Sequence, residues 1–265
     1  MAKSKNAAVR VCVLRTAGTN CDEETAYAFE KAGATAERVH VNEVARRAGA
    51  LDKFHILALP GGFSYGDDIA SGKLMANEMR FRIEDSVRRF VGAGKLVIGI
   101  CNGFQVLVKS GLLPRLKKNA VRATLSFNDS NRFEDRWVYL RAERTPCVFV
   151  RPGDDMYLPV AHGEGKFVGD AALLSELAAR SLIVFRYVGP AGAAGAGYPW
   201  NPNGSLQDIA GICDPTGRIF GLMPHPERHV AFTQHPRWTR EPRREEGDGI
   251  LVFRNAVAFA RENLA

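Results

Sequence analysis

The chain has 265 residues, of which 46% are hydrophobic and 25% charged, a composition typical of one large globular domain or two small ones. Its net charge is +7, but the basic residues are scattered among acidic ones, which argues against nucleic-acid binding. The apolar runs are too short to cross a membrane, and the first eight residues hold no apolar leader segment. The five cysteines show no metal-ligand spacing, so we expect no metal site and a reducing, cytoplasmic environment.

Alternating strands and helices are predicted for the first half. Apolar and β-branched runs predict strands at residues 9–14, 36–41, 54–59 and 95–100. Helices are predicted at residues 22–32, with Asn20 as the N-cap, and at 71–90 and 102–110. One long helix over 71–90 is indicated by an apolar stripe at every fourth residue, formed by Met75, Met79, Ile83, Val87 and Val91. Repeated β-α units predict a parallel sheet with helices on both faces.

The second half has a different pattern. Residues 122–188 hold few helical patterns and short β-like runs, such as 137–141 and 147–150, which predict extra β structure attached to the main sheet. Residues 189–204 are rich in Gly, Ala and Pro and predict a loop. A strand at 218–223 and a closing helix at 250–263 complete a single domain over residues 1–265. We expect an α/β fold with a mostly parallel sheet and a small additional β region.

The junction of the strand at 95–100 with the following helix carries the clearest chemical signal. Cys101 stands at this junction with Gly99 and Gly103 on either side, in the Gly-x-nucleophile-x-Gly pattern of a nucleophile elbow. Glycines are expected there because the turn is sharp and other backbone passes close by. A sulfur at a helix N-terminus is favoured as thiolate, and the Asn102 N–H can donate to an oxyanion. A buried structural cysteine is the alternative, which the two glycines disfavour.

A second glycine pair is predicted at the same edge of the sheet. Gly61 and Gly62 follow the strand at 54–59, at the carboxyl end where parallel sheets bind ligands. A glycine there lets a backbone N–H approach a substrate carbonyl, which would supply the second oxyanion donor. A plain turn is the alternative.

His225 is the candidate base. It follows the strand at 218–223, stands between two prolines, and lies two residues before Glu227. The carboxylate of Glu227 can orient the imidazole and stabilise imidazolium, as the third member of a catalytic triad does. His55, inside a predicted strand, is interpreted as a core histidine, and no role is assigned to His162 in its glycine-flanked segment.

Taken together, the glycine pair, the cysteine elbow and the late His-Pro-Glu resemble class I glutamine amidotransferases. The sequence is most similar to the glutaminase subunits of phosphoribosylformylglycinamidine synthases. The segments that carry this closer similarity are 61–67, 99–105, 131–134, 162–165, 198–204 and 223–228. They are spread over nearly the whole chain in the expected order. The greater length at 122–188 and at the charged segment 238–248 is more like the glutaminase domain of the large fused synthases, so the assembly stays open.

The resemblance implies a flavodoxin-like fold, a triad of Cys101, His225 and Glu227, an oxyanion hole at Gly62 and Asn102, and glutamine contacts from Gln105 and Gly61. It implies that glutamine is hydrolysed to glutamate and that ammonia passes to a synthetase subunit. That subunit would use ATP and magnesium to convert formylglycinamide ribonucleotide to formylglycinamidine ribonucleotide in purine biosynthesis. No cofactor is implied in this chain, which agrees with its lack of a phosphate-binding P-loop. A small accessory subunit is a further possible partner.

Two other functions are compatible with parts of the pattern. Cysteine peptidases or hydrolases of the same superfamily keep the elbow but usually place a histidine directly after the cysteine, where this chain has Asn102. A non-catalytic interaction subunit would not need to retain Cys101, His225 and Glu227 together.

Overall fold

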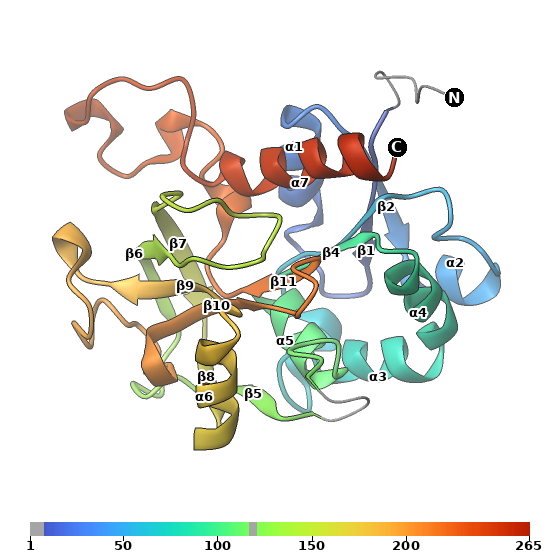
Figure 1. Cartoon of the computed structure of the whole chain (residues 1–265), viewed down its shortest axis with the longest axis horizontal. Coiled ribbons are helices and arrows are strands. Elements are labelled where there is room, and N and C mark those ends of the chain that lie inside the picture. The colour runs from blue at the N-terminus through green and yellow to red at the C-terminus, as the bar shows by residue number, and fades with distance from the viewer. Residues whose placement is uncertain (1–7, 117–120) are drawn as a thin grey trace.

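The computed structural model describes residues 8–116 and 121–265, and it contains one large central sheet (Figure 1). The strands of this sheet are β1 Arg10–Arg15, β2 Thr35–His40, β3 Ile56–Leu59, β4 Leu96–Ile100, β6 Glu134–Ala142, β7 Met156–His162, β9 Ile183–Val188, β10 Ile209–Cys213 and β11 Ile219–Leu222. Their order is β2-β1-β3-β4-β11-β10-β9-β6-β7. The strands from β2 to β11 are parallel, and β10, β9, β6 and β7 continue the sheet by antiparallel pairing.

The central strands are apolar along their whole length. Every residue of β3, β4 and β11 is buried, as expected for parallel strands covered on both faces. Their register pairs Leu59 with Gly99 and Leu222 with Ile100. The carboxyl ends of the three strands therefore meet at one edge, and the residues that follow each strand are brought together there.

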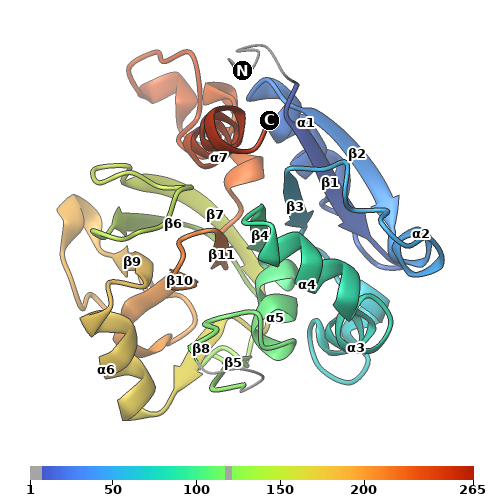
Figure 2. The ribbon, with the colours of Figure 1, turned by 45° about the vertical axis from the view of Figure 1, so that its right-hand side comes forward.

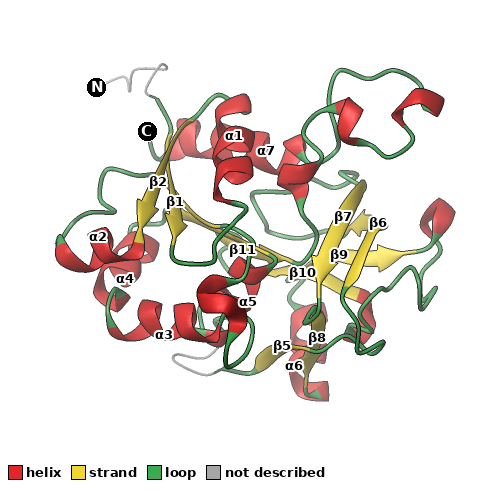
Figure 3. Ribbon diagram, turned by 180° about the vertical axis from the view of Figure 1, so that it is seen from behind, coloured by secondary structure: helices red, strands yellow, loops and turns green. Residues whose placement is uncertain are grey.

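Helices cover both faces of the sheet (Figures 2 and 3). Helices α1 Asp22–Lys31 and α7 Ile250–Asn263 lie on one face, where Phe29 and Phe253 meet edge to face with ring centroids 4.9 Å apart. Helices α3 Lys73–Phe81, α4 Glu84–Gly92 and α5 Asn102–Lys109 lie on the other. The predicted α/β sheet with helices on both faces and attached β structure is confirmed. Strands β5 Ala123–Ser126 and β8 Lys166–Gly169 form a separate antiparallel pair.

The single long helix predicted at 71–90 is wrong, because the chain forms α3 and α4 with a break at Arg82 and Ile83. At the break the Ile83 N–H bonds back to the Glu78 carbonyl, five residues away, instead of the usual four. An apolar residue at every fourth position drifts around a straight helix of 3.6 residues per turn. The break lets Met79, Ile83 and Val87 all stay buried.

Several local predictions differ from the structure. The residue preceding α1 is Cys21, not Asn20, because the Thr25 N–H bonds to the Cys21 carbonyl. Residues 147–150 form a turn rather than a strand, although Cys147, Phe149 and Val150 are buried, and the Val148 N–H bonds to the Gly217 carbonyl instead of a strand partner. Helices α2 Val41–Arg46 and α6 Ala171–Ala179 and strand β10 were not predicted. Within the described residues, no helix has the length and apolar character needed to cross a membrane.

Candidate active site

Cys101 occupies a strained turn between β4 and α5. Its φ of 51° and ψ of −107° are rarely adopted by a residue other than glycine. A Cβ on Gly99 would lie 2.5 Å from the Gly103 carbonyl oxygen, and one on Gly103 would lie 1.9 Å from the Leu59 carbonyl oxygen. Both flanking glycines are thus required by close backbone, as the sequence predicted. The strained elbow holds the cysteine at the N-terminus of α5, where the helix dipole stabilises a thiolate.

The Cys101 thiol is almost fully buried and faces strand β7. Its Sγ lies 3.7 Å from the carbonyl oxygen of Ala161, and its backbone N–H donates to the Leu222 carbonyl at 2.8 Å. The nucleophile is therefore held between the end of β11 and the edge of β7.

His225 and Glu227 form a buried pair beside this thiol. The Nδ1 atom of His225 lies 2.6 Å from Oε1 of Glu227, and both side chains are shielded from solvent. Burial disfavours imidazolium, but attraction from Glu227 and from Cys101 outweighs it and holds the pKa of His225 well above its usual value. His225 Nε2 is buried and has no hydrogen-bond partner among the described residues. The ring therefore has one nitrogen fixed by a carboxylate and one left for a proton exchanged with the nucleophile.

The outer edge of β7 connects the triad to the C-terminal part of the chain. The Pro159 carbonyl accepts a hydrogen bond from the His225 N–H at 2.8 Å, two residues from Ala161. Two residues further back, the Tyr157 N–H donates to Asp248 Oδ2 and its carbonyl lies 2.9 Å from His229 Nδ1. The charged segment 238–248 is thus anchored to the same strand edge that contacts Cys101 and His225, a connection with no local sequence signal.

The glycine pair lies at the carboxyl end of β3, as predicted, and the structure places Gly61 against the imidazole of His225. A Cβ on Gly61 would come within 2.7 Å of His225 Cε1, and Gly62 has a φ of +132° with Asn20 backbone 2.7 Å from where its Cβ would be. Among the described residues, the N–H groups of Gly62 and Asn102 donate no hydrogen bond. Both remain free for an oxyanion, and their role as oxyanion donors stays a prediction.

The side-chain amide of Gln105 forms hydrogen bonds with the surrounding segments. Its Nε2 donates to the Glu164 carbonyl at 2.6 Å, and its Oε1 accepts from Asn102 Nδ2 at 3.0 Å. The same Asn102 amide lies 3.1 Å from Asp67, in the loop that follows the glycine pair. Both ends of the Gln105 amide are therefore engaged by the protein, and its contact with glutamine stays a prediction.

His162 lies at the end of β7 within a buried polar network. Its Nδ1 is 3.1 Å from Asn128 Oδ1 and its Nε2 is 3.4 Å from Asn203 Nδ2. Burial, reinforced by nearby His225, lowers the pKa of His162 to about 3. It is thus a neutral residue that ties two loops together. His55 precedes β3 and is half-buried, so the prediction of a core histidine inside the strand is wrong, although its Nδ1 accepts a hydrogen bond from the Arg10 N–H at 3.0 Å.

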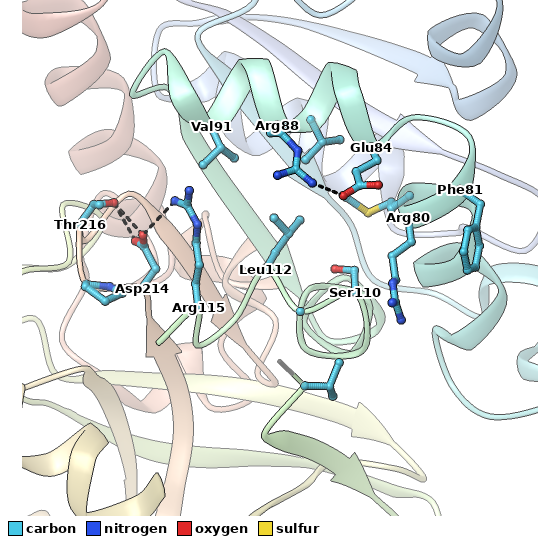
Figure 4. A pocket seen from close by; sticks show the side chains of 15 residues that line it. Arg80, Phe81, Glu84, Arg88, Val91, Ser110, Leu112, Arg115, Asp214 and Thr216 are labelled. Atoms are coloured by element: carbon cyan, nitrogen blue, oxygen red, sulfur yellow. Dashed lines mark hydrogen bonds and ion pairs between the residues drawn. The ribbon is translucent and has the colours of Figure 1, made fainter. Parts of the chain in front are cut away.

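A cavity of the described chain lies away from these residues. It has a volume of about 720 Å³ and is bounded by α3, α4, the end of α5 and the turn after β10 (Figure 4). Arg80, Arg88 and Arg115 line it, but Arg88 is paired with Glu84 and Arg115 lies 3.8 Å from Asp214. None of the triad residues lines this cavity, so its size is no guide to the catalytic site.

A strained elbow cysteine beside a buried His–Glu pair, at the carboxyl edge of a sheet covered on both faces, is the arrangement of a class I glutamine amidotransferase. Comparison with known families agrees: residues 8–260 match the CobB/CobQ-like glutamine amidotransferase domain, and the chain belongs to this family.

Individual relatives are similar over nearly their full length. The chain is 51% identical over 255 residues to phosphoribosylformylglycinamidine synthase subunit PurQ of Dehalococcoides mccartyi, covering 96% of this chain and 98% of the relative. It is 42% identical to the protein of the same name from Methanococcus maripaludis strain S2, covering 94% and 97%. Among solved structures, a chain of PurLQS from Thermotoga maritima superposes with a TM-score of 0.72 at 32% identity, covering 96% of this chain and 99% of that one. These similarities support the amidotransferase over the peptidase and non-catalytic alternatives.

Proposed function

We propose that this chain is the glutaminase subunit of phosphoribosylformylglycinamidine synthase. It hydrolyses glutamine to glutamate and supplies ammonia to a synthetase subunit, which uses ATP to convert formylglycinamide ribonucleotide to formylglycinamidine ribonucleotide in purine biosynthesis. The observation that carries the chemistry is the buried His225–Glu227 pair at 2.6 Å beside the elbow cysteine. The full-length similarity to subunits of that synthase supports the particular substrate and partner.

In the proposed mechanism, the thiolate of Cys101 attacks the side-chain amide carbon of glutamine. The carbonyl oxygen becomes an oxyanion held by the N–H groups of Gly62 and Asn102. The protonated ring of His225 gives its proton to the leaving nitrogen, the C–N bond breaks, and a γ-glutamyl thioester remains. A water molecule, deprotonated by the same ring, then attacks the thioester and releases glutamate and the thiolate.

The remaining residues have positioning roles in this proposal. Glu227 fixes the tautomer of His225 and stabilises imidazolium, while Gly61 and Gln105 contact the substrate. We place residues 1–265 in one glutaminase domain that works in the cytoplasm and holds no cofactor of its own. ATP and magnesium belong to the synthetase, and a small accessory subunit completes the partners. The segment 238–248, anchored to β7 through Asp248, is our candidate contact surface.

The test compares two nitrogen sources in the reconstituted enzyme. Cys101→Ser should abolish glutamine-dependent synthesis and spare synthesis driven by ammonium, because the synthetase site lies in another subunit. Cys213→Ser is the matched control, since its buried thiol already pairs with the Thr145 hydroxyl at 3.4 Å and a serine can take its place. Loss of both activities in a folded Cys101→Ser complex would contradict the assignment to ammonia supply.

A further inference from the structure

A second cysteine, Cys21, lies beside the imidazole of His225. Cys21 precedes α1, and its Sγ, a ring nitrogen of His225 and a carboxylate oxygen of Glu227 all lie within 4.8 Å of one another. All three side chains are buried. The three loops that carry Cys21, the glycine pair and His225 meet here, and the Cys21 N–H lies 3.3 Å from the Gly61 carbonyl.

One feature shows that this cluster has unused ligand capacity. Oε2 of Glu227 is buried and has no hydrogen-bond partner in the described part of the chain, although a carboxylate oxygen in that position normally has one. Gly61 packs tightly against the cluster, because a Cβ there would lie 3.2 Å from Cys21 Sγ and 2.7 Å from the imidazole. A sulfur, a ring nitrogen and a carboxylate oxygen are thus held within 4.8 Å of one another.

The donor set selects one chemical class of ligand. Zinc and similar borderline-soft divalent cations bind thiolate, imidazole and carboxylate at about 2.0–2.3 Å in tetrahedral geometry. Magnesium and calcium prefer oxygen ligands only. We propose that Cys21, His225 and Glu227 form an inhibitory binding site for a thiophilic divalent cation such as Zn²⁺. The inhibitory part rests on the proposed glutaminase function, whereas the binding itself does not.

Inhibition follows from the two nitrogens of the ring. A cation that binds the imidazolium form at Nδ1 displaces to solvent the proton that Nδ1 shares with Glu227, and the ring keeps its other proton on Nε2. An imidazole protonated at Nε2 cannot accept the proton of Cys101 or of the hydrolytic water. The Cys21 thiol loses its proton to solvent on binding. Arg228, whose Nη2 lies 3.2 Å from Cys21 Sγ, can remain as a donor to the metal-bound sulfur.

Direct binding is measured with Co²⁺, which gives a near-ultraviolet charge-transfer band when it binds thiolate. The full chain carrying Cys101→Ala is titrated with Co²⁺. The substitution removes the Cys101 thiol as a competing ligand. We expect a saturating band that Zn²⁺ competes away. In the matched double variant Cys101→Ala/Cys21→Ser the band should be lost or the affinity should fall at least tenfold. A band of equal strength in both proteins, or none in either, would overturn the site.

Inhibition is measured as glutaminase activity of the reconstituted enzyme at increasing Zn²⁺, each variant being normalised to its own activity without metal. Cys21→Ser should raise the half-inhibitory Zn²⁺ concentration at least tenfold. Equal sensitivity would place the inhibitory cation on Cys101 and refute the proposal. The Co²⁺ titration does not depend on turnover, so it still tests cation binding if the proposed glutaminase function is wrong.

Discussion

Removing the charge of Glu227 while keeping its shape tests the triad most directly. In Glu227→Gln the side-chain oxygen can still accept a hydrogen bond from His225 Nδ1, but the carboxylate that stabilises imidazolium is gone. A hydrogen bond to a charged group contributes about 1.5–3 kcal/mol and a neutral one about 0.5–1.5 kcal/mol. The difference is roughly 1–2 kcal/mol, which predicts a loss of about 5–30-fold in kcat/KM for glutamine.

The same substitution should change the pH dependence of the nucleophile. In the parent protein Glu227 and Cys101 hold the pKa of His225 above its usual value against the opposing effect of burial. Without the carboxylate, burial is opposed only by the two cysteines, Cys101 and Cys21, and the pKa of His225 falls. The imidazolium that stabilises a Cys101 thiolate is then lost at lower pH, so alkylation of Cys101 by iodoacetamide should need a higher pH to reach the same rate.

Both measurements have a matched control and a clear contrary result. Glu84→Gln removes a carboxylate of similar size that is half exposed and paired with Arg88 on the surface, where such pairs contribute little. It should leave both the rate and the pH profile unchanged. An unchanged alkylation profile in Glu227→Gln, or a loss as large as the roughly 10²–10⁴-fold expected for His225→Ala, would show that Glu227 does not act through its charge on the ring.

Two further predictions concern stability. Gly103→Ala places a Cβ 1.9 Å from the Leu59 carbonyl and should destabilise the fold by about 3 kcal/mol in urea unfolding, whereas Gly163→Ala, with no atom within 4 Å of the new Cβ, should change it by less than about 0.5 kcal/mol. Equal effects would refute the steric argument for the elbow. Because the pKa of His162 is lowered to about 3, the unfolded chain binds a proton before the folded chain does. Stability should therefore fall below about pH 6.5 by up to about 1.4 kcal/mol per pH unit from this group, and His162→Gln should flatten that slope.

The sequence alone was sufficient for the features that neighbouring residues impose on one another. The elbow needs two glycines within two residues of Cys101 because close backbone excludes a Cβ at both positions. The His225–Glu227 pair spans only two residues, so its contact could be expected from spacing. The β-α alternation of the first half likewise follows from local apolar periodicity, and the closing helix was predicted with its exact bounds.

The break between α3 and α4 shows where local pattern fails. The stripe from Met75 to Val91 is apolar at regular spacing, but the chain breaks at Arg82 and Ile83, which keeps Met79, Ile83 and Val87 buried together. Similarly, residues 147–150 have the composition of a strand but form a turn, in which the Val148 N–H bonds to the Gly217 carbonyl and the Cys147 N–H to the Thr145 hydroxyl. In both segments the apolar composition predicted which side chains are mostly buried, whereas contacts with other parts of the fold decided the backbone conformation.

Tertiary structure alone brought the surroundings of the triad together. Strand β7 presents the Ala161 carbonyl to Cys101 and the Pro159 carbonyl to His225 because it lies at the end of the sheet with one edge unpaired by another strand. Cys21 reaches the same imidazole because the parallel register of the central strands makes loops from far apart in the chain converge at one edge. Neither the contact of β7 with Cys101 and His225 nor that of Cys21 with His225 could be predicted from the sequence. Backbone groups of any residue type can line a strand edge, and a single cysteine far from His225 in the sequence forms no motif with it.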